Sequence, residues 1–251
     1  MKERDGIVDI EGILREKGIV LRRRTPLWVM LWSAFLYASG ASLRRVRDAI
    51  GHRCRRSHVA IWKWIQKFGS SLKDMFSLNG ELPSTIVVDE TPLMEGRREC
   101  YLWVAMDPRN RSIVYVAITQ VRNVLVTMSF FKAIKRTYGK YPDLVLTDGG
   151  VWYPYTLGRL GMEHRVICGG ARSYVERFME TVKDRARPFD KYFPCDLRCD
   201  LSHILNWVRL NVMYYNWARP HESLANRPPL GGRRVSSWRM FKSIMIRAML
   251  S

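Results

Sequence analysis

The chain has 251 residues and is 47% hydrophobic, which is enough for one large folded domain or two modest ones. Its formal net charge of +19 and isoelectric point near 10.2 favour a polyanionic partner such as nucleic acid. Five cysteines without a regular pairing pattern argue against a secreted disulfide scaffold. The alternative explanations of the charge are a basic surface without such a partner and a surface that meets an anionic membrane.

Residues 1–24 mix acidic and basic side chains, and we interpret them as an N-terminal arm without an assigned role. The run Leu27–Tyr37 is nearly all apolar, but a helix that crosses a bilayer needs about 18 to 20 such residues. The run also starts too far inside the chain for an ordinary signal peptide. We therefore interpret it as a buried helix that begins after Pro26, and we expect a cytoplasmic protein without a membrane span.

Two further helices are predicted over residues 42–51 and 57–68, joined by a tight turn that is rich in arginine. This is the layout of a helix-turn-helix, whose second helix enters the major groove of DNA. We therefore predict an all-α DNA-binding domain over residues 25–78. Its candidate DNA contacts lie in the turn and on the outward face of the second helix: Arg53, Arg55, Arg56, Ser57, His58, Lys63 and Lys67. The alternative is an ordinary helical hairpin with a solvated basic face.

The second of these helices has apolar residues at steps of three and four, which predict its buried face. They are Ile61, Trp64, Ile65 and Phe68. Gln66 belongs to the outward set. The stretch 69–84 begins with Gly69-Ser70-Ser71 and ends near Pro83, a composition that predicts a linker.

A second region begins at Thr85 with a short apolar run that ends on Asp89. The run reads as a buried strand, followed by a turn through residues 94–98. If the strand continues past Asp89, Glu90 faces the opposite side of the sheet. The later predicted elements are strands at 100–106 and 112–119, a helix at 124–138, a strand from 144, a helix near 153–160, a strand at 164–168 and a helix around 173–183. This order predicts a mixed sheet with helices packed on it.

Two more acidic residues stand at comparable places in this region. The strand that starts at Leu144 ends on Asp148 and breaks on two glycines, and Glu176 lies on the last predicted helix. That helix buries an apolar stripe and has a polar stripe beside it, which consists of Glu176, Glu180, Lys183 and Arg187. Two strand ends and one helix can bring Asp89, Asp148 and Glu176 to one point. Clustered carboxylates need a positive charge between them, and their oxygens suit Mg²⁺ or Mn²⁺.

The three acids in this order, with Lys183 seven residues after Glu176, resemble the catalytic core of DDE transposases and retroviral-type integrases. The run 215–224 is similar to the Tyr-Asn-x-x-Arg-Pro-His-x-Ser-Leu tail that follows this core in many insertion-sequence transposases. The resemblance covers roughly residues 30–230. It implies an α/β, ribonuclease-H-like core with a helical tail over residues 84–230, and a basic C-terminal helix follows over 231–251.

The resemblance implies a transposase that binds the ends of its insertion element and catalyses metal-dependent DNA strand cleavage and strand transfer. Asp89, Asp148 and Glu176 would be catalytic and would hold two divalent ions, Mg²⁺ or Mn²⁺. Lys183 and Arg187 would contact the DNA backbone. The partners would be double-stranded element ends and target DNA, bound by a homodimer or a larger oligomer.

Several alternatives remain open at this point. The family often has Asn four residues before its Glu, whereas this chain has Arg172, and Glu180 is a rival for the third acid. Trp152 and Tyr153 could stack on a displaced base or pack in the core. Other candidate functions are a catalytically decayed, sequence-specific DNA-binding protein and a metal-dependent nuclease without strand transfer.

Overall fold

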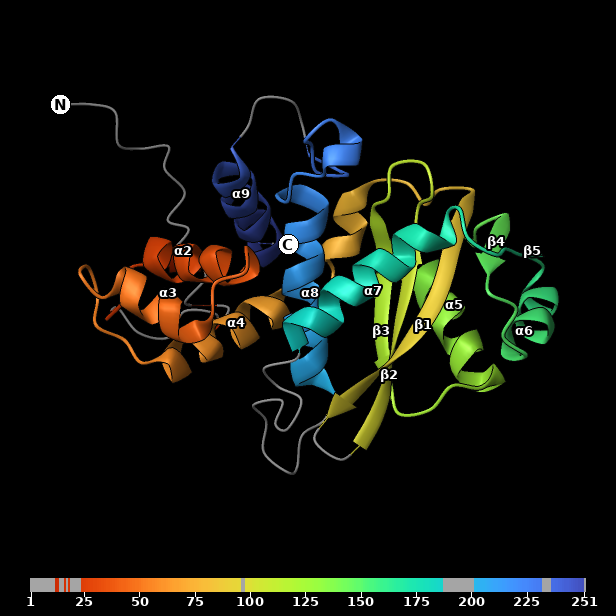
Figure 1. Cartoon of the computed structure of the whole chain (residues 1–251), viewed down its shortest axis with the longest axis horizontal. Coiled ribbons are helices and arrows are strands. Elements are labelled where there is room, and N and C mark those ends of the chain that lie inside the picture. The colour runs from red at the N-terminus through yellow and green to blue at the C-terminus, as the bar shows by residue number, and fades with distance from the viewer. Residues whose placement is uncertain are drawn as a thin grey trace.

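The computed structural model describes residues 24–95, 98–186, 201–231 and 236–250, together with positions 12, 13, 16 and 18. Its sheet has the order β3-β2-β1-β4-β5 (Figure 1). The strands are β1 (Thr85–Glu95), β2 (Arg98–Met106), β3 (Ile113–Thr119), β4 (Leu144–Thr147) and β5 (Glu163–Val166). The first three are antiparallel neighbours, whereas β4 pairs in parallel with both β1 and β5, so the sheet is mixed.

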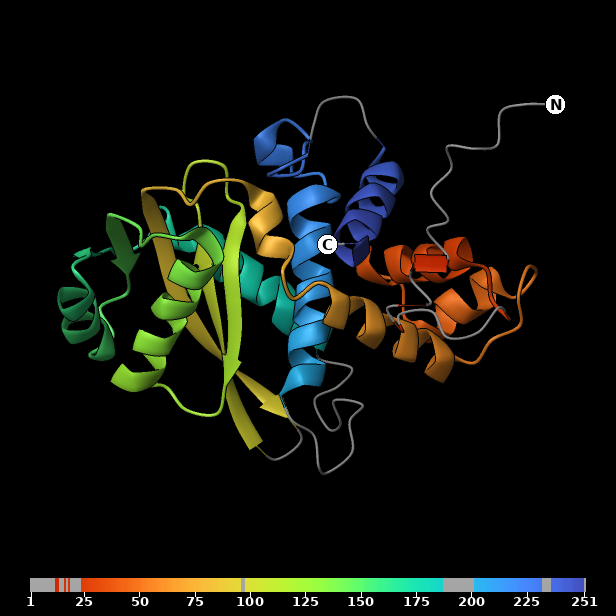
Figure 2. The same cartoon turned by 180° about the vertical axis from the view of Figure 1, so that it is seen from behind.

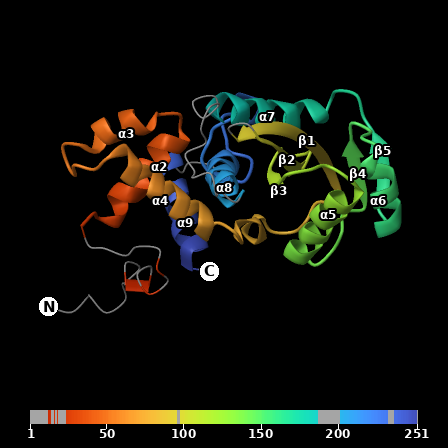
Figure 3. The same cartoon turned by 90° about the horizontal axis from the view of Figure 1, so that it is seen from below.

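Helices cover both faces of this sheet. α5 (Val124–Tyr138) and α6 (Trp152–Leu160) lie on one face, as the view from behind shows (Figure 2). α7 (Arg172–Ala186) crosses the other face, and α8 (Ser202–Trp217) packs beside β3 (Figure 3). The chain order of strands and helices is the predicted one, and the predicted ribonuclease-H-like architecture is confirmed.

The first strand is longer than its apolar run predicts. β1 continues to Glu95 and pairs with β2 up to Arg98, so the predicted turn through 94–98 is wrong in its extent. Backbone hydrogen bonds to β2 sustain the strand where hydrophobicity stops. Because side chains alternate along a strand, Val87 packs toward α7 and α8 while Val88 packs toward α5 and α6. Asp89 shares the side of Val87, and Glu90 shares the side of Val88, as predicted.

The remaining helices form a bundle at one end of the sheet (Figure 1). They are α2 (Leu27–Ala38), α3 (Leu43–Ile50), α4 (His58–Ser71) and α9 (Ser237–Leu250). The prediction of a buried helix after Pro26 is confirmed, because α2 contributes core residues such as Leu31. Among the described residues, no helix is long and apolar enough to cross a membrane. The basic helix α9 packs on α2 and α8 through rings that include Trp238 and Phe241, which meet Phe35.

Two details of α4 differ from the sequence pattern. Trp62 is buried and Trp64 is only half-buried, and Gln66 donates a 3.1 Å hydrogen bond to the carbonyl of His203 on α8. The physical reason is that α4 packs against α8 as well as α2 and α3, so it buries more than one stripe. The predicted outward position of Gln66 is therefore wrong.

The predicted linker over 69–84 is also wrong in part. Gly69 and the two serines after it continue α4, and a short 3₁₀ helix, η1 (Met75–Asn79), follows with Met75 and Phe76 buried. A Cβ atom on Gly69 would lie 2.1 Å from the carbonyl oxygen of Asn206, so α4 and α8 touch backbone to backbone there. Glycine at this position permits close packing of the two helices. The composition of residues 69–84 alone could not distinguish this role from that of a loop residue.

One continuous core joins the helical bundle to the sheet. A single cluster of buried side chains contains Leu31 of α2, Ile61 of α4, Trp207 of α8, Val182 of α7 and Val87 of β1. α8 lies between the two parts and is buried along most of its length (Figure 3). The bundle is therefore fixed to the sheet through α8.

The end of α8 is fastened to the edge strand β3. The side-chain oxygen of Asn216 accepts a 2.8 Å hydrogen bond from the Ile113 amide, and its nitrogen donates a 2.8 Å bond to the Ile113 carbonyl. The tail then turns back through η3 (Glu222–Leu224) and a bridge between His221 and Arg227. Asn216 thus supplies the edge strand with the pair of hydrogen bonds that a neighbouring strand would otherwise give.

Candidate active site

Asp89 and Asp148 are neighbours because β1, which contains Asp89, and β4, which ends just before Asp148, are paired in the sheet. β1 and β4 run in parallel with Thr85 opposite Leu144, and the same register, continued, places Asp89 level with Asp148. Asp89 is buried, and its Oδ1 accepts a 2.9 Å hydrogen bond from the Glu90 amide. Asp148 follows β4 in a more open position, and its Oδ1 accepts a 3.1 Å bond from the Gly150 amide. Both carboxylates therefore lie at the same edge of the sheet.

The third acid joins them through one arginine. Nε of Arg172 lies 3.4 Å from Oδ2 of Asp89 and 3.2 Å from Oε1 of Glu176, one turn further along α7. A second nitrogen of the same guanidinium lies 3.8 Å from Oδ2 of Asp148. The structure thus brings together all three acids that the sequence singled out. In the sequence, Arg172 stood out only as a departure from the family pattern. Its position four residues before Glu176 was the signal that the two side chains lie on the same face of the helix.

Burial and the repulsion between like charges both disfavour the charged form of the acids at this site. Burial raises the pKa of the Asp89 carboxyl, and the charge of Asp148 raises it further, while Arg172 acts in the opposite direction. Partial burial also opposes the charge on Arg172, but the surrounding carboxylates outweigh it and the pKa of Arg172 is raised. Arg172 is therefore the counter-charge that holds the three acids together in this structure.

The donor set suits a divalent cation. Three carboxylates offer the oxygen ligands that Mg²⁺ and Mn²⁺ prefer, and a cation, the Arg172 guanidinium, already lies where they converge. Within the described part of the chain, no three acidic, histidine or cysteine side chains stand close enough to hold an ion as they are arranged. Asp89, Asp148 and Glu176 would hold it once Arg172 moves aside.

Other predicted residues line the same hollow. Glu180 and Lys183 of α7 border it together with the three acids, and both are exposed. Arg172 pairs with Glu176 and not with Glu180, which favours Glu176 as the third acid. Arg187 lies outside the described residues. Contact of Lys183 with DNA stays a prediction.

A second acidic side chain, that of Glu90, lines the same hollow and meets residues that pack on the other face of the sheet. The Tyr153 hydroxyl donates a short hydrogen bond to Glu90, and Arg122 lies 3.5 Å from the same carboxylate. Burial raises the pKa of Glu90, as do the charges of Asp148 and Asp89, although the bond from Tyr153 lowers it. Tyr153 is fully buried, so packing in the core is its role. The alternation of side chains along β1 was the signal that could have marked Glu90 as this buried partner.

The α3–α4 hairpin, which contains the predicted DNA contacts, lies apart from β1 and β4 (Figure 1). Ser57 caps α4 by accepting a 3.2 Å hydrogen bond from the Ala60 amide. Arg56 donates a 2.7 Å bond to the Thr25 hydroxyl and others to backbone carbonyls, so it fastens the start of α2 to that of α4. The remaining candidates are exposed or half-buried: Arg53, Arg55, His58, Lys63 and Lys67. Binding of DNA by this face stays a prediction.

Known proteins resemble this chain in the region of the three acids. Residues 84–185, from β1 to α7, match the model of a family described as a DDE domain. The uncharacterized protein MJ0017 of Methanocaldococcus jannaschii is 30% identical over 204 residues, which cover 81% of this chain and 92% of that protein. The chain belongs to the DDE-domain family. The matched region of this DDE-domain protein contains Asp89, Asp148, Glu176 and Arg172.

Two solved structures are similar to this DDE-domain protein at lower identity. One is a simian T-cell lymphotropic virus intasome in complex with PP2A regulatory subunit B56 gamma, with a TM-score of 0.45 and 16% identity over 64% of this chain. This chain spans 55% of that chain. The other is the HTLV-2 integrase catalytic core domain in complex with magnesium, with a TM-score of 0.44 and 16% identity, which covers 64% of this chain and 99% of that one.

Proposed function

We propose that the protein is a DNA transposase, a polynucleotidyl transferase that binds the ends of an insertion element, cuts a DNA strand there and joins the freed end to target DNA. The observation that carries this proposal is the meeting of Asp89, Asp148 and Glu176 around one cation, inside a DDE domain. The net charge of +19 supports a nucleic-acid partner.

The three carboxylates would hold two Mg²⁺ or Mn²⁺ ions, which would stabilise the attacking and leaving oxygens of an in-line displacement at phosphorus. Side chains of the protein itself bind the DNA. Lys183, which borders the hollow, and Arg187 bind the DNA backbone, and the α3–α4 hairpin, as a helix-turn-helix, binds the element end. Two element ends are cut and joined together, so the working form is a homodimer or a larger oligomer.

The test is nicking of a labelled duplex that carries the DNA flanking this gene, with and without Mg²⁺ or Mn²⁺. Wild type should cut only with metal, and Asp148→Asn should abolish cutting because it removes a metal ligand. Asp143→Asn is the matched control, since Asp143 is an exposed acid before the same strand. Cutting by Asp148→Asn at the wild-type rate would remove the active-site assignment.

One observation favours a second candidate, a DNA-binding protein that has lost catalysis. Arg172 occupies the centre of the acid cluster, where the family often has Asn. Binding of the duplex without cutting under every metal would establish this second function. Cutting without joining of the labelled end to target DNA would instead indicate a nuclease.

A further inference from the structure

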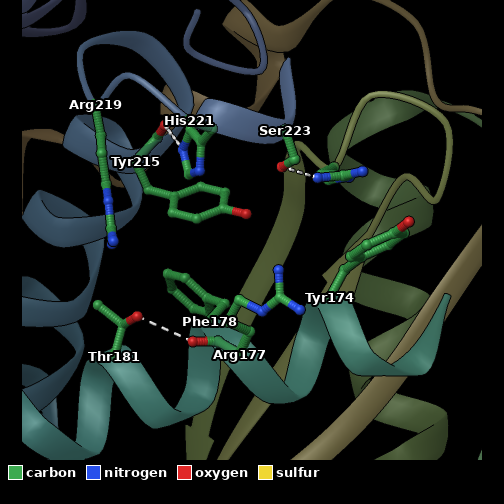
Figure 4. A pocket seen from close by; sticks show the side chains of 9 residues that line it. Tyr174, Arg177, Phe178, Thr181, Tyr215, Arg219, His221 and Ser223 are labelled. Atoms are coloured by element: carbon green, nitrogen blue, oxygen red, sulfur yellow. Dashed lines mark hydrogen bonds between the residues drawn. The ribbon is translucent and has the colours of Figure 1, made fainter. Parts of the chain in front are cut away.

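A small hollow lies between α7 and the tail (Figure 4). Its lining includes three arginines and several aromatic rings: Arg111, Arg177, Arg219, Tyr174, Tyr215 and His221. The cavity volume is about 50 Å³. A water molecule needs roughly 10 to 15 Å³ by this measure, so the hollow holds a few oxygen-sized atoms, as in one phosphate group.

The charge of this hollow is positive and unbalanced. Among the described residues, no acidic side chain lines it, and none of the three arginines forms an ion pair with a carboxylate. Burial lowers the pKa of His221, the hydrogen bond to the Tyr215 carbonyl raises it, and the charges of Arg219 and Arg111 lower it. Three guanidinium groups around one small space make an anion its best-suited occupant.

The hollow is also held in shape before any ligand arrives. The guanidinium of Arg111 donates to the Ser223 hydroxyl and lies 4.0 Å from the centre of the Tyr174 ring. The Tyr215 ring packs edge-on against His221, with ring centres 4.5 Å apart. Arg177 rises from α7 and Arg219 descends from the tail, on opposite sides of the Tyr215 ring (Figure 4). Three segments that are distant in sequence therefore build one site.

The hollow and the acid cluster are neighbours along α7. Arg177 directly follows Glu176 on α7, and it lines both hollows. A nucleic-acid strand that lies across Asp89, Asp148 and Glu176 would therefore have a neighbouring phosphate within reach of Arg177 and the tail.

We propose that this hollow binds one backbone phosphate of the DNA strand that occupies the active site, with Arg111, Arg177 and Arg219 as its ligands. The inference rests on the proposed function. In this arrangement the tail has two roles. Asn216 binds the tail to the sheet, and Arg219 positions the substrate strand. The planar guanidinium forks suit two phosphate oxygens at once.

The experiment measures binding in an Asp148→Asn background, so that cutting does not enter the result. The probe is a fluorescein-labelled duplex of the DNA that flanks the gene, titrated at several salt concentrations. Adding Arg219→Gln should weaken binding about tenfold and reduce the salt slope by about one, the effect of one phosphate contact. Adding Arg159→Gln, an exposed arginine at the end of α6, should change neither and controls for lost charge.

A second series locates the phosphate. Duplexes that carry one uncharged methylphosphonate linkage should reveal a position that weakens binding by Asp148→Asn alone but not by Asp148→Asn with Arg219→Gln. Arg177→Gln should remove the same sensitivity, and Arg219→Lys should keep the salt slope while losing affinity. Thermal melting of each variant checks folding, and Arg177→Gln decides the case if Arg219→Gln unfolds.

The outcomes separate this inference from the function on which it rests. If the arginine variants bind with unchanged affinity and slope while the wild type still cuts DNA, the phosphate site is wrong and the transposase stands. If no variant binds the duplex even at low salt, both are overturned.

Discussion

At the scale of single residues, Arg172 decides the state of the acid cluster. Its guanidinium contacts Asp89, Asp148 and Glu176, and its charge replaces that of the divalent ions that the same oxygens would bind. The arrangement is both a support and a competitor: it relieves the repulsion between the acids, and it occupies the point where they converge. Removal of Arg172 should therefore affect metal binding and metal-free stability in opposite directions.

We expect Arg172→Asn to bind Mn²⁺ more tightly than wild type, by about tenfold, which corresponds to roughly 1.4 kcal/mol. Isothermal titration calorimetry with Mn²⁺ measures this directly. Without metal the variant should melt at a lower temperature, and added Mn²⁺ should raise its melting temperature more than that of wild type. Arg165→Asn is the matched control, because among the described residues Arg165 pairs with Glu163 alone, at the surface. Equal Mn²⁺ affinity in wild type and Arg172→Asn would contradict the competitor role.

At the scale of elements, α8 connects the parts that the chain order separates. Its N-terminal half packs against α4, with Asn206 in backbone contact with Gly69, and its C-terminal end is bound to β3 through Asn216. Each of these contacts gives a sharp expectation about stability.

Gly69→Ala should destabilise the protein by about 1 to 3 kcal/mol, because the new methyl group would force α4 away from α8. Gly158→Ala is a matched control within α6, where nothing lies within 4 Å of the added Cβ. That change should be neutral or stabilise the helix by about 1 kcal/mol or less. Chemical denaturation measures both, and a Gly69→Ala variant as stable as wild type would disprove the close packing.

Asn216→Ala should lower the free energy of unfolding by about 1 to 3 kcal/mol, because it leaves the Ile113 amide unpaired, whereas the Ile113 carbonyl keeps a 3.0 Å hydrogen bond from Asn79. Asn206→Ala should cost less, because its side-chain amide donates a longer hydrogen bond, 3.4 Å, to Gln66. Urea denaturation of the two variants beside wild type provides the comparison. If Asn206→Ala proved the more damaging change, the fastening of β3 by Asn216 would be unimportant.

At the scale of the whole molecule, the net charge predicts that the affinity for DNA depends strongly on salt. A net charge of +19 spread over 251 residues makes counterion release a large part of any DNA affinity. We expect the association constant for a labelled duplex to fall about a thousandfold or more between 50 and 200 mM salt, as for proteins with six to ten phosphate contacts. Fluorescence anisotropy at a series of salt concentrations measures the slope. An affinity that ignores salt would exclude a phosphate-dominated interface.

The sequence by itself determined the strand and helix order of the core, the two strand-end acids and the helical one. These features rest on local pattern: apolar runs broken by glycine, helical spacing, and acids placed where strands end. The family resemblance added the fold and the chemistry that the acids imply.

Only the tertiary structure decided what each acid meets. The parallel register of β1 and β4 put Asp89 level with Asp148, and the crossing of α7 brought Arg172 among the acids. The tertiary structure also showed Gly69 as a packing contact rather than a linker residue, and it placed Arg177 and Arg219 in the lining of one hollow. These facts depend on contacts between segments far apart in the chain, and spacing within one segment carries no information about which distant backbone or charge will lie against it.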